Sequence, residues 1–242
     1  MYINNISVII PAYNEESRIL QTINQIGKYL KEHFKNYEII VINDGSIDRT
    51  ASLLAEACTR FAETKILQND KNVGKGYSVK KGVLFSMSSA ILICDADLST
   101  PIEEIEKLIP WFNNGFDIVI GSRRLKDSEI VIRQPWYREK MGCIFNILVR
   151  GLTISGIKDT QCGFKLFNAE IARKIFNKSR INGFSYDVEI LFISMLNGFK
   201  IKEVPVRWSH SPDSKIKLLK DSFKMLIDLF KIRFYYLCGT YK

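Results

Sequence analysis

In the stretch Ala90-Ile91-Leu92-Ile93-Cys94-Asp95-Ala96-Asp97, five apolar residues lead directly into two carboxylates that are one residue apart. A short apolar run of this kind is typical of a strand that is buried on both faces of a parallel sheet. Asp95 and Asp97 then stand at the carboxyl end of that strand. Because open parallel sheets bind ligands at this end, the stretch predicts both the type of fold and the position of its site.

Further short apolar runs alternate with helical patterns along the first half of the chain. The predicted strands cover residues 6–10, 37–42, 64–67, 90–94 and 117–120. The predicted helices cover about residues 16–34, 48–61 and 76–87, and a further helix begins at Pro101. This alternation indicates an α/β fold of the Rossmann-like type, in which helices flank a mostly parallel sheet. Polar residues and glycines follow all five strands, which favours a ligand site at the strand ends.

The charge of the chain is divided unevenly between its two halves. The 242 residues carry 35 Lys and Arg against 26 Asp and Glu, which gives a net charge of +9. Residues 1–121 have a net charge of −3, and residues 122–242 have a net charge of +12. This division predicts two binding tasks, the second directed at an anionic partner such as nucleic acid, a lipid surface or a phosphorylated ligand.

Composition and cysteine usage exclude several classes of protein. With 46% hydrophobic residues, the chain can bury a sizeable core, which excludes a disordered tail protein. The five cysteines form no CxxC pair and no metal-binding pattern with histidine, so we expect reduced thiols in a cytosolic setting. The sequence predicts neither a secretory signal nor a membrane-spanning helix, since no run of about 18 apolar residues occurs.

Two of the loops contain residues that suit metal and phosphate. Two carboxylates at a strand end can share a divalent cation, and such ligands suit Mg²⁺ or Mn²⁺ carrying a diphosphate. Alternatively, Asp97 or Ser99 caps the helix that opens at Pro101. Gly74-Lys75-Gly76 allows N–H groups and an ammonium to approach phosphate, or it forms a simple glycine turn. The absence of a Walker loop and of GxGxxG argues against an NTPase and a dehydrogenase.

Together these motifs resemble glycosyltransferase family 2, whose members are inverting enzymes with a nucleotide-sugar-binding GT-A fold. In the first half the resemblance rests on Val8-Ile9-Ile10-Pro11-Ala12-Tyr13-Asn14-Glu15-Glu16, Ile42-Asn43-Asp44-Gly45-Ser46-x-Asp48-x-Thr50, Asn72-x-Gly74-Lys75-Gly76 and Asp95-Ala96-Asp97. In the second half it rests on Gly121-Ser122-Arg123, Asp159-Thr160-Gln161-Cys162-Gly163-Phe164-Lys165-Leu166-Phe167, Phe184-x-x-Asp187-Val188-Glu189, Glu203-Val204-Pro205-Val206 and Ser214-Lys215. The second set resembles the branch that glycosylates polyprenyl phosphates, and residues 159–167 resemble its members that transfer glucose to dolichyl phosphate.

The resemblance implies roles for the residues at matching positions. The nucleoside of a UDP-glucose donor would be held by Pro11, Tyr13, Glu15 and Asp44, with Asp44 on the base. The donor site would be completed by Ser46, Gly74 and Lys75, and Mg²⁺ or Mn²⁺ with the diphosphate would be held by Asp95 and Asp97. The acceptor phosphate would be bound by Arg123, Arg138 and Lys215, and the sugar would lie beside Asp187 and Glu189. The implied catalytic residues are Asp97, Arg123 and Arg138.

A lipid monophosphate acceptor would need no general base. Its second pKa lies near 6, so its oxygen is largely an anion at neutral pH and can attack the anomeric carbon directly. A single displacement then converts an α donor into a β product. The protein would have to align the reactants, neutralise the acceptor with arginines and stabilise the leaving nucleoside diphosphate.

The C-terminal segment, residues 213–242, is predicted to form a basic amphipathic helix after a catalytic domain of residues 1–212. Its polar stripe contains Lys217, Lys220, Lys224, Asp228 and Lys231, and its apolar face contains Leu219, Phe223, Leu226, Phe230, Phe234 and Leu237. That face can pack on the core or on a partner subunit of a homo-oligomer, or it can lie in an anionic bilayer surface. We expect a cytoplasmic protein that is peripheral on the cytosolic face of a membrane.

Departures from the family pattern and alternative functions also follow from the sequence. Asn43 stands where many relatives have a second Asp, and we expect no N-terminal membrane anchor like that of the eukaryotic glucosyl enzymes. The donor can instead be GDP-mannose, or the acceptor a sugar hydroxyl, which would require a base such as Asp159 or Asp187. A catalytically idle nucleotide-sugar-binding protein is a further alternative. A nucleic-acid-binding module is disfavoured, because no RNP or zinc-finger pattern occurs.

Overall fold

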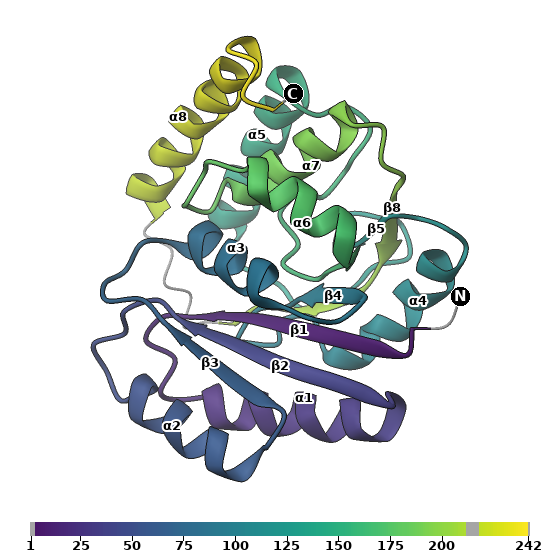
Figure 1. Ribbon diagram of the computed structural model, residues 1–242. Helices are drawn as coiled ribbons and strands as arrows, with labels where there is room; N and C mark the ends of the chain where they lie inside the picture. Colours follow the sequence, from purple (N-terminus) through teal and green to yellow (C-terminus); the bar gives the residue numbers. More distant parts are fainter. Residues whose placement is uncertain (1–2, 212–217, 242) are drawn as a thin grey trace.

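The structure, a computed structural model, describes residues 3–211 and 218–241 and is built around one large sheet. Seven strands follow the order β3-β2-β1-β4-β7-β5-β8 (Figure 1). Their bounds are β1 (Asn5–Ala12), β2 (Asn36–Asn43), β3 (Thr64–Gln68), β4 (Ala90–Ile93), β5 (Ile118–Ser122), β7 (Lys165–Asn168) and β8 (Ile201–Pro205). Residues 90–93 therefore form the central strand of the sheet, and Asp95 and Asp97 follow it.

The sheet is parallel except at β7. That strand runs antiparallel to both of its neighbours, β4 and β5, whereas the other neighbouring strands pair in parallel. Two shorter strands, β6 (Glu129–Ile132) and β9 (Arg207–Ser209), pair with each other in a separate small sheet. The predicted α/β class with a mostly parallel sheet is confirmed.

Helices cover the sheet on both faces (Figure 1). One layer consists of α1 (Ile19–His33), α2 (Thr50–Arg60) and α4 (Ile105–Asn113), and the other includes α3 (Lys75–Phe85), α6 (Ala169–Lys178) and α7 (Tyr186–Leu196). Successive strand residues point to opposite faces, so Val8 and Ile10 belong to the first core while Ile9 belongs to the second. This two-sided burial explains why the central strands are apolar throughout.

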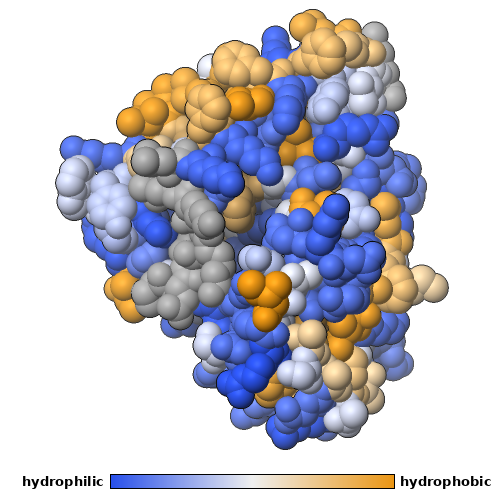
Figure 2. Space-filling model, turned by 90° about the vertical axis from the view of Figure 1, so that its left-hand side faces the viewer, coloured by the Kyte–Doolittle hydropathy of each residue, from blue (hydrophilic) through white to orange (hydrophobic). Residues whose placement is uncertain are grey.

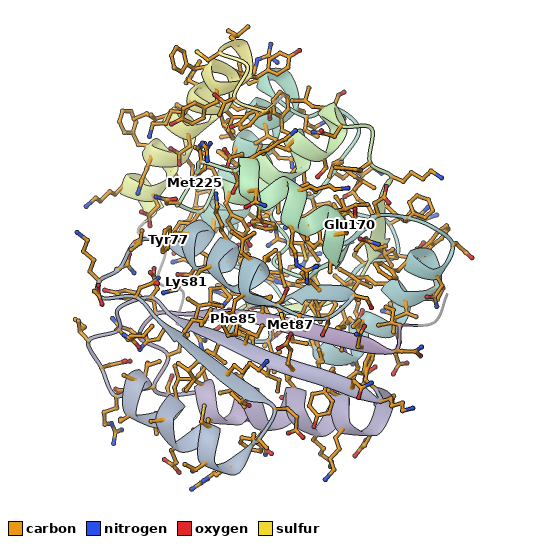
Figure 3. All side chains as sticks on the ribbon, in the orientation of Figure 1. Tyr77, Lys81, Phe85, Met87, Glu170 and Met225 are labelled. Carbon is orange, nitrogen blue, oxygen red and sulfur yellow. The ribbon has the colours of Figure 1, made fainter. Side chains whose placement is uncertain are left out.

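The helix predicted to open at Pro101 begins differently in the structure. Pro101 precedes a single 3₁₀ turn, η1 (Ile102–Glu104), and α4 begins directly after that turn. On the other face, α3 faces the sheet with the buried Val79 and Val83. Its outer side carries Tyr77, Lys81 and Phe85, which are spaced one helical turn apart (Figure 3).

Two further helices, α5 (Trp136–Leu152) and α8 (Leu218–Leu237), are neighbours and join the second core. Helix α8 packs there with Leu229 and Ile232. The apolar face predicted for this helix is not the face on the core, since Phe223, Phe230 and Phe234 are exposed. The Leu219 side chain and the predicted boundary at residue 212 lie outside the described residues.

Exposed apolar side chains gather on this side of the molecule. Figure 2, in which the α8 side faces the viewer, shows hydrophobic surface along its upper edge. On α5 the large exposed apolar residues are Trp136, Tyr137, Ile144, Ile147 and Leu148. Within the two described ranges, none of the helices combines the length and the apolarity needed to cross a bilayer.

Candidate active site

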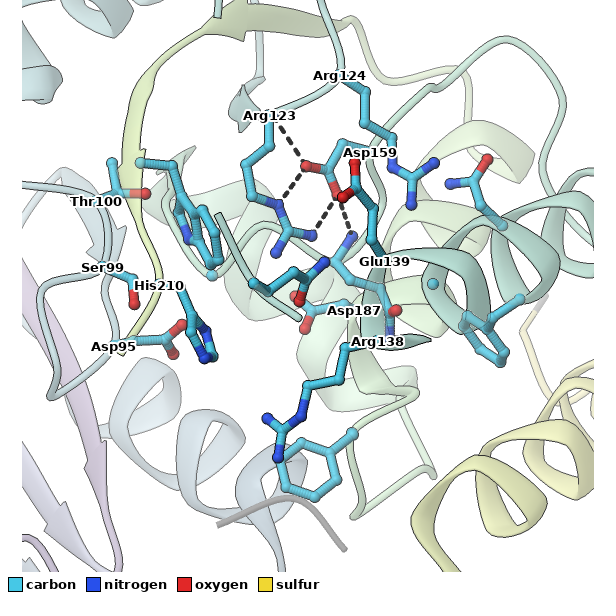
Figure 4. Close-up of a pocket in the computed structure, with 18 of the residues that line it drawn as sticks. Asp95, Ser99, Thr100, Arg123, Arg124, Arg138, Glu139, Asp159, Asp187 and His210 are labelled. Atoms are coloured by element: carbon cyan, nitrogen blue, oxygen red, sulfur yellow. Dashed lines mark hydrogen bonds and ion pairs between the residues drawn. The ribbon is translucent and has the colours of Figure 1, made fainter. Parts of the chain in front are cut away.

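Two cavities open at the carboxyl ends of the parallel strands. The first, which we call the arginine cavity, has a volume of about 580 Å³ and is lined in part by Arg123, Arg124, Arg133 and Arg138 (Figure 4). The second, which we call the strand-end cavity, has a volume of about 440 Å³ and is lined in part by Pro11, Tyr13, Glu15, Asp44 and Gly74. Both cavities are lined by Lys75, Asp95 and Asp97. A basic chamber and a loop-lined chamber therefore meet at the carboxylate pair.

The strand-end cavity brings together the residues predicted to bind a donor, apart from Ser46. The register of β1 on β2 pairs Ala12 with Asn43, which sets the loops after the two strands side by side. Ser46 is not among the described residues that line this cavity, and its Oγ accepts the N–H of Asn14 at 2.9 Å. The structure therefore gives Ser46 a position that supports the loop.

Asp44 is buried at the edge of this cavity and organises the neighbouring loop. One carboxylate oxygen accepts N–H groups from Asn69 Nδ2 at 2.8 Å and from the backbone of Val73 at 3.0 Å. The other accepts the backbone N–H of Gly74 at 2.9 Å. Asp44 thus holds the loop that leads into α3, a role that its position in the sequence did not indicate.

The carboxylates of Asp95 and Asp97 differ in their surroundings. Asp95 forms an ion pair with Lys75, with Nζ at 2.6 Å from Oδ1. Burial raises the pKa of Asp95, but the charge and hydrogen bond of Lys75, together with the charges of Lys165 and Arg123, hold it below its usual value. Burial, followed by the charge of Asp95, raises the pKa of Asp97. Asp97 also accepts the N–H of Ser99 at 2.9 Å, within the turn that precedes Pro101. The alternative that Asp97 or Ser99 caps the following helix differs from the structure, since neither η1 nor α4 has a side-chain cap.

The carboxylate pair fits a divalent cation that carries ligands of its own. Burial and then the charge of Asp95 raise the pKa of Asp97, and a bound cation would favour the ionised form of both carboxylates. Within residues 3–211 and 218–241, no three His, Cys, Asp or Glu side chains gather as a metal cluster. Mg²⁺ commonly uses one or two carboxylates together with water and phosphate oxygens. The residues present therefore suit a cation that arrives with a diphosphate.

Gly163 is required by the position of Asp95. A Cβ at residue 163 would lie 2.1 Å from Asp95 Oδ2, well inside any normal contact. The backbone of the segment before β7 therefore forms a wall against the carboxylate. This contact explains why the Asp159–Phe167 motif contains glycine at this position, which the sequence alone did not explain.

Arg123 is held rigidly at the wall of the arginine cavity. Its Nε and Nη2 donate to the two oxygens of Asp159 at 2.7 and 2.8 Å, and its backbone N–H donates at 2.9 Å (Figure 4). Burial opposes ionisation of Asp159, but Arg123 overcomes it and lowers the pKa of Asp159 to about 2. Arg123 therefore brings a fixed cation, with most of its charge already balanced.

Arg138 and Arg133 bring positive charge that is less fully balanced. Arg138 lies on α5 and points into the cavity (Figure 4). Neither side chain forms an ion pair with the described part of the chain. Arg124 lines the same cavity, where its Nη1 donates to Cys143 Sγ at 3.5 Å. This concentration of cations makes the cavity suited to an anion.

Asp187 lies in the arginine cavity, whereas Glu189 does not. The Asp187 carboxylate pairs with the fully buried Lys165 of β7, whose Nζ also donates to the carbonyl of Cys162 at 2.5 Å. Glu189 instead accepts N–H groups from Arg180 and Ile181, each at 2.8 Å, as well as the Tyr241 hydroxyl. Both residues are in α7, and residues two apart on a helix point about 200° apart. The structure thus differs from the expectation that Glu189 lines the sugar side.

Several lining residues were not identified from the sequence. Trp208 and His210 reach the arginine cavity from β9 and from the residue after it, and His210 donates its backbone N–H to Ile132 at 3.0 Å. The guanidinium of Arg123 lies over the Trp208 ring, 5.4 Å from its centre. No local motif marks these positions, because the small β6–β9 sheet brings them into place. Lys215, a predicted phosphate ligand, lies outside the described residues.

Comparison with known proteins identifies sequence relatives over nearly the whole chain. The model of "Glycosyl transferase family 2" matches residues 7–176. A dolichyl-phosphate beta-glucosyltransferase of Dictyostelium discoideum is 39% identical over 98% of this chain and 76% of the relative. Proteins of the same name are 34% identical in Homo sapiens, over 98% of this chain and 77% of the relative, and 35% identical in Saccharomyces cerevisiae, over 98% and 76%.

Solved structures share the fold at much lower sequence identity. Mannosyl-3-phosphoglycerate synthase from Rubrobacter xylanophilus matches with a TM-score of 0.69 and 18% identity, over 97% of this chain and 75% of that one. Glucosyl-3-phosphoglycerate synthase from Mycobacterium tuberculosis, crystallised with Mn²⁺, UDP and its product, matches with a TM-score of 0.67 and 17% identity, over 95% and 80%. These matches confirm the predicted GT-A type of fold.

We expect Gly163→Ala to weaken binding of Mn²⁺, because the new methyl group must displace the Asp95 carboxylate. Disturbing the residues that position a metal ligand typically weakens metal binding about 10- to 100-fold. Titration of the nucleotide-bound protein with Mn²⁺, followed by electron paramagnetic resonance, measures the effect.

The matched control is Gly142→Ala, another glycine that lines the arginine cavity. A Cβ there would lie 3.4 Å from Arg124 Nη2, which is an ordinary contact. Equal Mn²⁺ affinity in both variants would contradict the supporting role of Gly163.

Proposed function

Because this chain belongs to glycosyltransferase family 2 and is therefore a glycosyltransferase, we propose that it transfers glucose from UDP-glucose to dolichyl phosphate or a similar polyprenyl phosphate, with inversion. The observation that carries this proposal is the meeting of the two cavities at Asp95 and Asp97. A donor diphosphate and an acceptor phosphate can approach one point from opposite sides there. The names of the relatives support the choice of glucose and of dolichyl phosphate.

On the donor side, the strand-end cavity would hold the nucleoside. Pro11, Tyr13 and Glu15 line it from the loop after β1, and Asp44 lines it from the loop after β2. Lys75 and Gly74 stand where the cavity reaches Asp95, so the diphosphate would lie beside them. Asp95 and Asp97 would hold Mg²⁺ or Mn²⁺, which would stabilise the charge that develops on the departing diphosphate.

On the acceptor side, the arginine cavity would hold the lipid phosphate. Arg138 and Arg133 offer guanidinium groups that form no ion pair with described residues, and their planar forks match phosphate oxygens. Arg123 adds a fixed positive charge because Asp159 holds its orientation. We propose Arg138 as the main phosphate ligand and Arg123 as a fixed electrostatic contributor.

The ion pairs of Asp159 and Asp187 favour a phosphate acceptor over a sugar hydroxyl. A hydroxyl acceptor would need a general base, for which Asp159 and Asp187 are the candidates. Asp159 has both oxygens bound to Arg123 and a pKa of about 2, so it is a weak base. Asp187 is paired with the buried Lys165. A phosphate monoester attacks as an anion without a protein base, and then needs only alignment with the leaving group.

The exposed faces of α5 and α8 support a membrane surface as the place of reaction. Both helices line the arginine cavity, through Phe145 of α5 and Met225 of α8 among others. Their outer sides carry large apolar residues, among them Ile147 and Phe234, which are 69% and 62% exposed. An interfacial helix binds a bilayer with such a face. All five cysteines are unpaired, which supports the cytosolic side of that membrane.

The transfer is tested with purified protein, Mn²⁺, dolichyl phosphate and either UDP-glucose or GDP-mannose, by chromatography of the lipid product. We expect lipid-linked glucose from UDP-glucose, and we expect Asp97→Asn to reduce turnover at least about 100-fold, because it removes one of the two carboxylates. The control Asp70→Asn changes an exposed loop aspartate and should leave turnover unchanged. Product from GDP-mannose alone would replace glucose by mannose in the proposal, and no product from either donor would contradict it.

Arg138→Ala is expected to raise the KM for dolichyl phosphate about 10- to 100-fold, which corresponds to the loss of one charged hydrogen bond. The KM for UDP-glucose should change little, because Arg138 lines only the arginine cavity. Steady-state kinetics with each substrate varied in turn measure both values. Arg150→Ala, which removes an exposed arginine of the same helix, is the matched control. If Arg138→Ala raised the KM for both substrates equally, Arg138 would not be a ligand of the acceptor phosphate.

Membrane binding is tested with the double variant Phe230→Glu/Phe234→Glu and with vesicles that contain anionic lipid. We expect the variant to lose at least about tenfold in affinity, since burying each Phe contributes about 1.5–3 kcal/mol. Cosedimentation measures binding. The control is Met87→Glu, at a residue that is 82% exposed in the loop between α3 and β4. If the wild-type chain does not bind vesicles but forms dimers that the double variant abolishes, a second copy of the chain covers the apolar face of α8 instead.

A further inference from the structure

Lys75 lies where the two cavities meet and places its ammonium group beside Asp95. Its Nζ lies 2.6 Å from Asp95 Oδ1, and the same side chain lines both cavities. It also lies 5.9 Å from the centre of the Tyr186 ring, a weak cation–π contact. The side chain is 21% exposed, and that of Asp95 is 34% exposed, so an incoming ligand can reach both.

The backbone of Lys75 is fixed while its side chain is free to change partners. Gly74 has a φ of +120°, and a Cβ there would meet the carbonyl oxygen of Asn182 at 2.4 Å. A Cβ at Gly76 would meet the carbonyl oxygen of Ile181 at 2.5 Å. The loop is therefore clamped on both sides of Lys75. A lysine side chain has four rotatable bonds beyond Cα, so its ammonium can move without any movement of this backbone.

Lys75 is the cation that forms an ion pair with Asp95 among the described residues. Asp187 already has Lys165 as its partner, and Arg123 has Asp159. A lysine ammonium is charged at neutral pH, so Lys75 brings a positive charge to the point where the two cavities meet. A divalent cation at Asp95 and Asp97 would put two further positive charges beside that ammonium. Lys75 and the cation therefore compete for the Asp95 carboxylate.

We propose that Lys75 is an exchangeable counter-ion, which neutralises Asp95 in the ligand-free protein and transfers to the donor diphosphate when a divalent cation takes that carboxylate. The inference rests on the metal site of the proposed function. It adds that the cation and the nucleotide bind cooperatively: the cation alone must displace Lys75 without a new partner for the ammonium, whereas the diphosphate supplies that partner. By linkage, each ligand then strengthens the other by the same factor.

The alternative is a permanent structural pair, in which Lys75 stays on Asp95 throughout the reaction. The two alternatives differ in what removal of the ammonium does to metal binding. Removal of an exchanging cation frees Asp95 and strengthens binding of the metal alone. Removal of a structural cation leaves Asp95 misplaced, and binding of the metal is unchanged or weaker.

The test is titration with Mn²⁺, followed by electron paramagnetic resonance, with and without saturating UDP. For the wild-type chain we expect UDP to raise the Mn²⁺ affinity about tenfold or more, within the usual range of such coupling. For Lys75→Met we expect the nucleotide-free affinity to rise about tenfold and the enhancement by UDP to fall by a similar factor. Lys71→Met removes an exposed lysine from the same loop and should behave like the wild type.

Lys75→Gln provides a second variant if Lys75→Met does not fold, because its amide can still donate to Asp95 without carrying a charge. Unchanged or weaker binding of Mn²⁺ by the nucleotide-free variants would overturn the exchange and leave the metal site intact. Absence of Mn²⁺ binding by the wild-type chain, even with UDP, would overturn the metal site and the exchange together. The two failures are thus distinguishable.

Discussion

The position of the Asp95 carboxylate is the constraint on which the rest of the site depends. Strand β4, at the centre of the sheet, brings Asp95 to the edge where the cavities meet. Lys75 then holds one oxygen, and the bare backbone of Gly163 lies against the other. These contacts come from three distant parts of the chain, so any ligand of Asp95 touches elements of both halves. The site thus couples the acidic half to the basic half at a single side chain.

Some of the cations that line the arginine cavity, or lie beside it, are paired with carboxylates, whereas others form no ion pair with described residues. Arg123 is paired with Asp159, and Lys165 is paired with Asp187. The low pKa of Asp159 leaves that carboxylate poorly suited to accept a proton. The positive charge that stays available comes from Arg133, just before α5, and from Arg138 of α5, the helix whose outer face is apolar. One helix therefore connects the surface on which a lipid would lie to the cavity in which its phosphate would bind.

Much of the first half could be predicted from sequence, because its strands are apolar on both faces and each ends in a polar loop. The second half offered no such pattern. Strand β7 inserts antiparallel between β4 and β5, and Trp208 and His210 reach the cavity through the small second sheet. Those placements depend on tertiary contacts that no local motif records. The motif with Asp187 and Glu189 was found, but the helical period turns only the first toward the cavity.

The antiparallel insertion of β7 also sets the order in which the chain can fold. During synthesis β4 gains its second neighbour only when residues 165–168 emerge, and β5 has neither of its partners before then. A nascent chain that ends before β7 therefore leaves one edge of β4 and both edges of β5 unpaired. Such edges are prone to wrong pairing with other chains. A gap in the middle of the sheet thus closes only after the strands on both of its sides have been made, and β8 joins β5 later still. A ribosome that pauses before residue 165 would leave this gap open to chaperones or to aggregation.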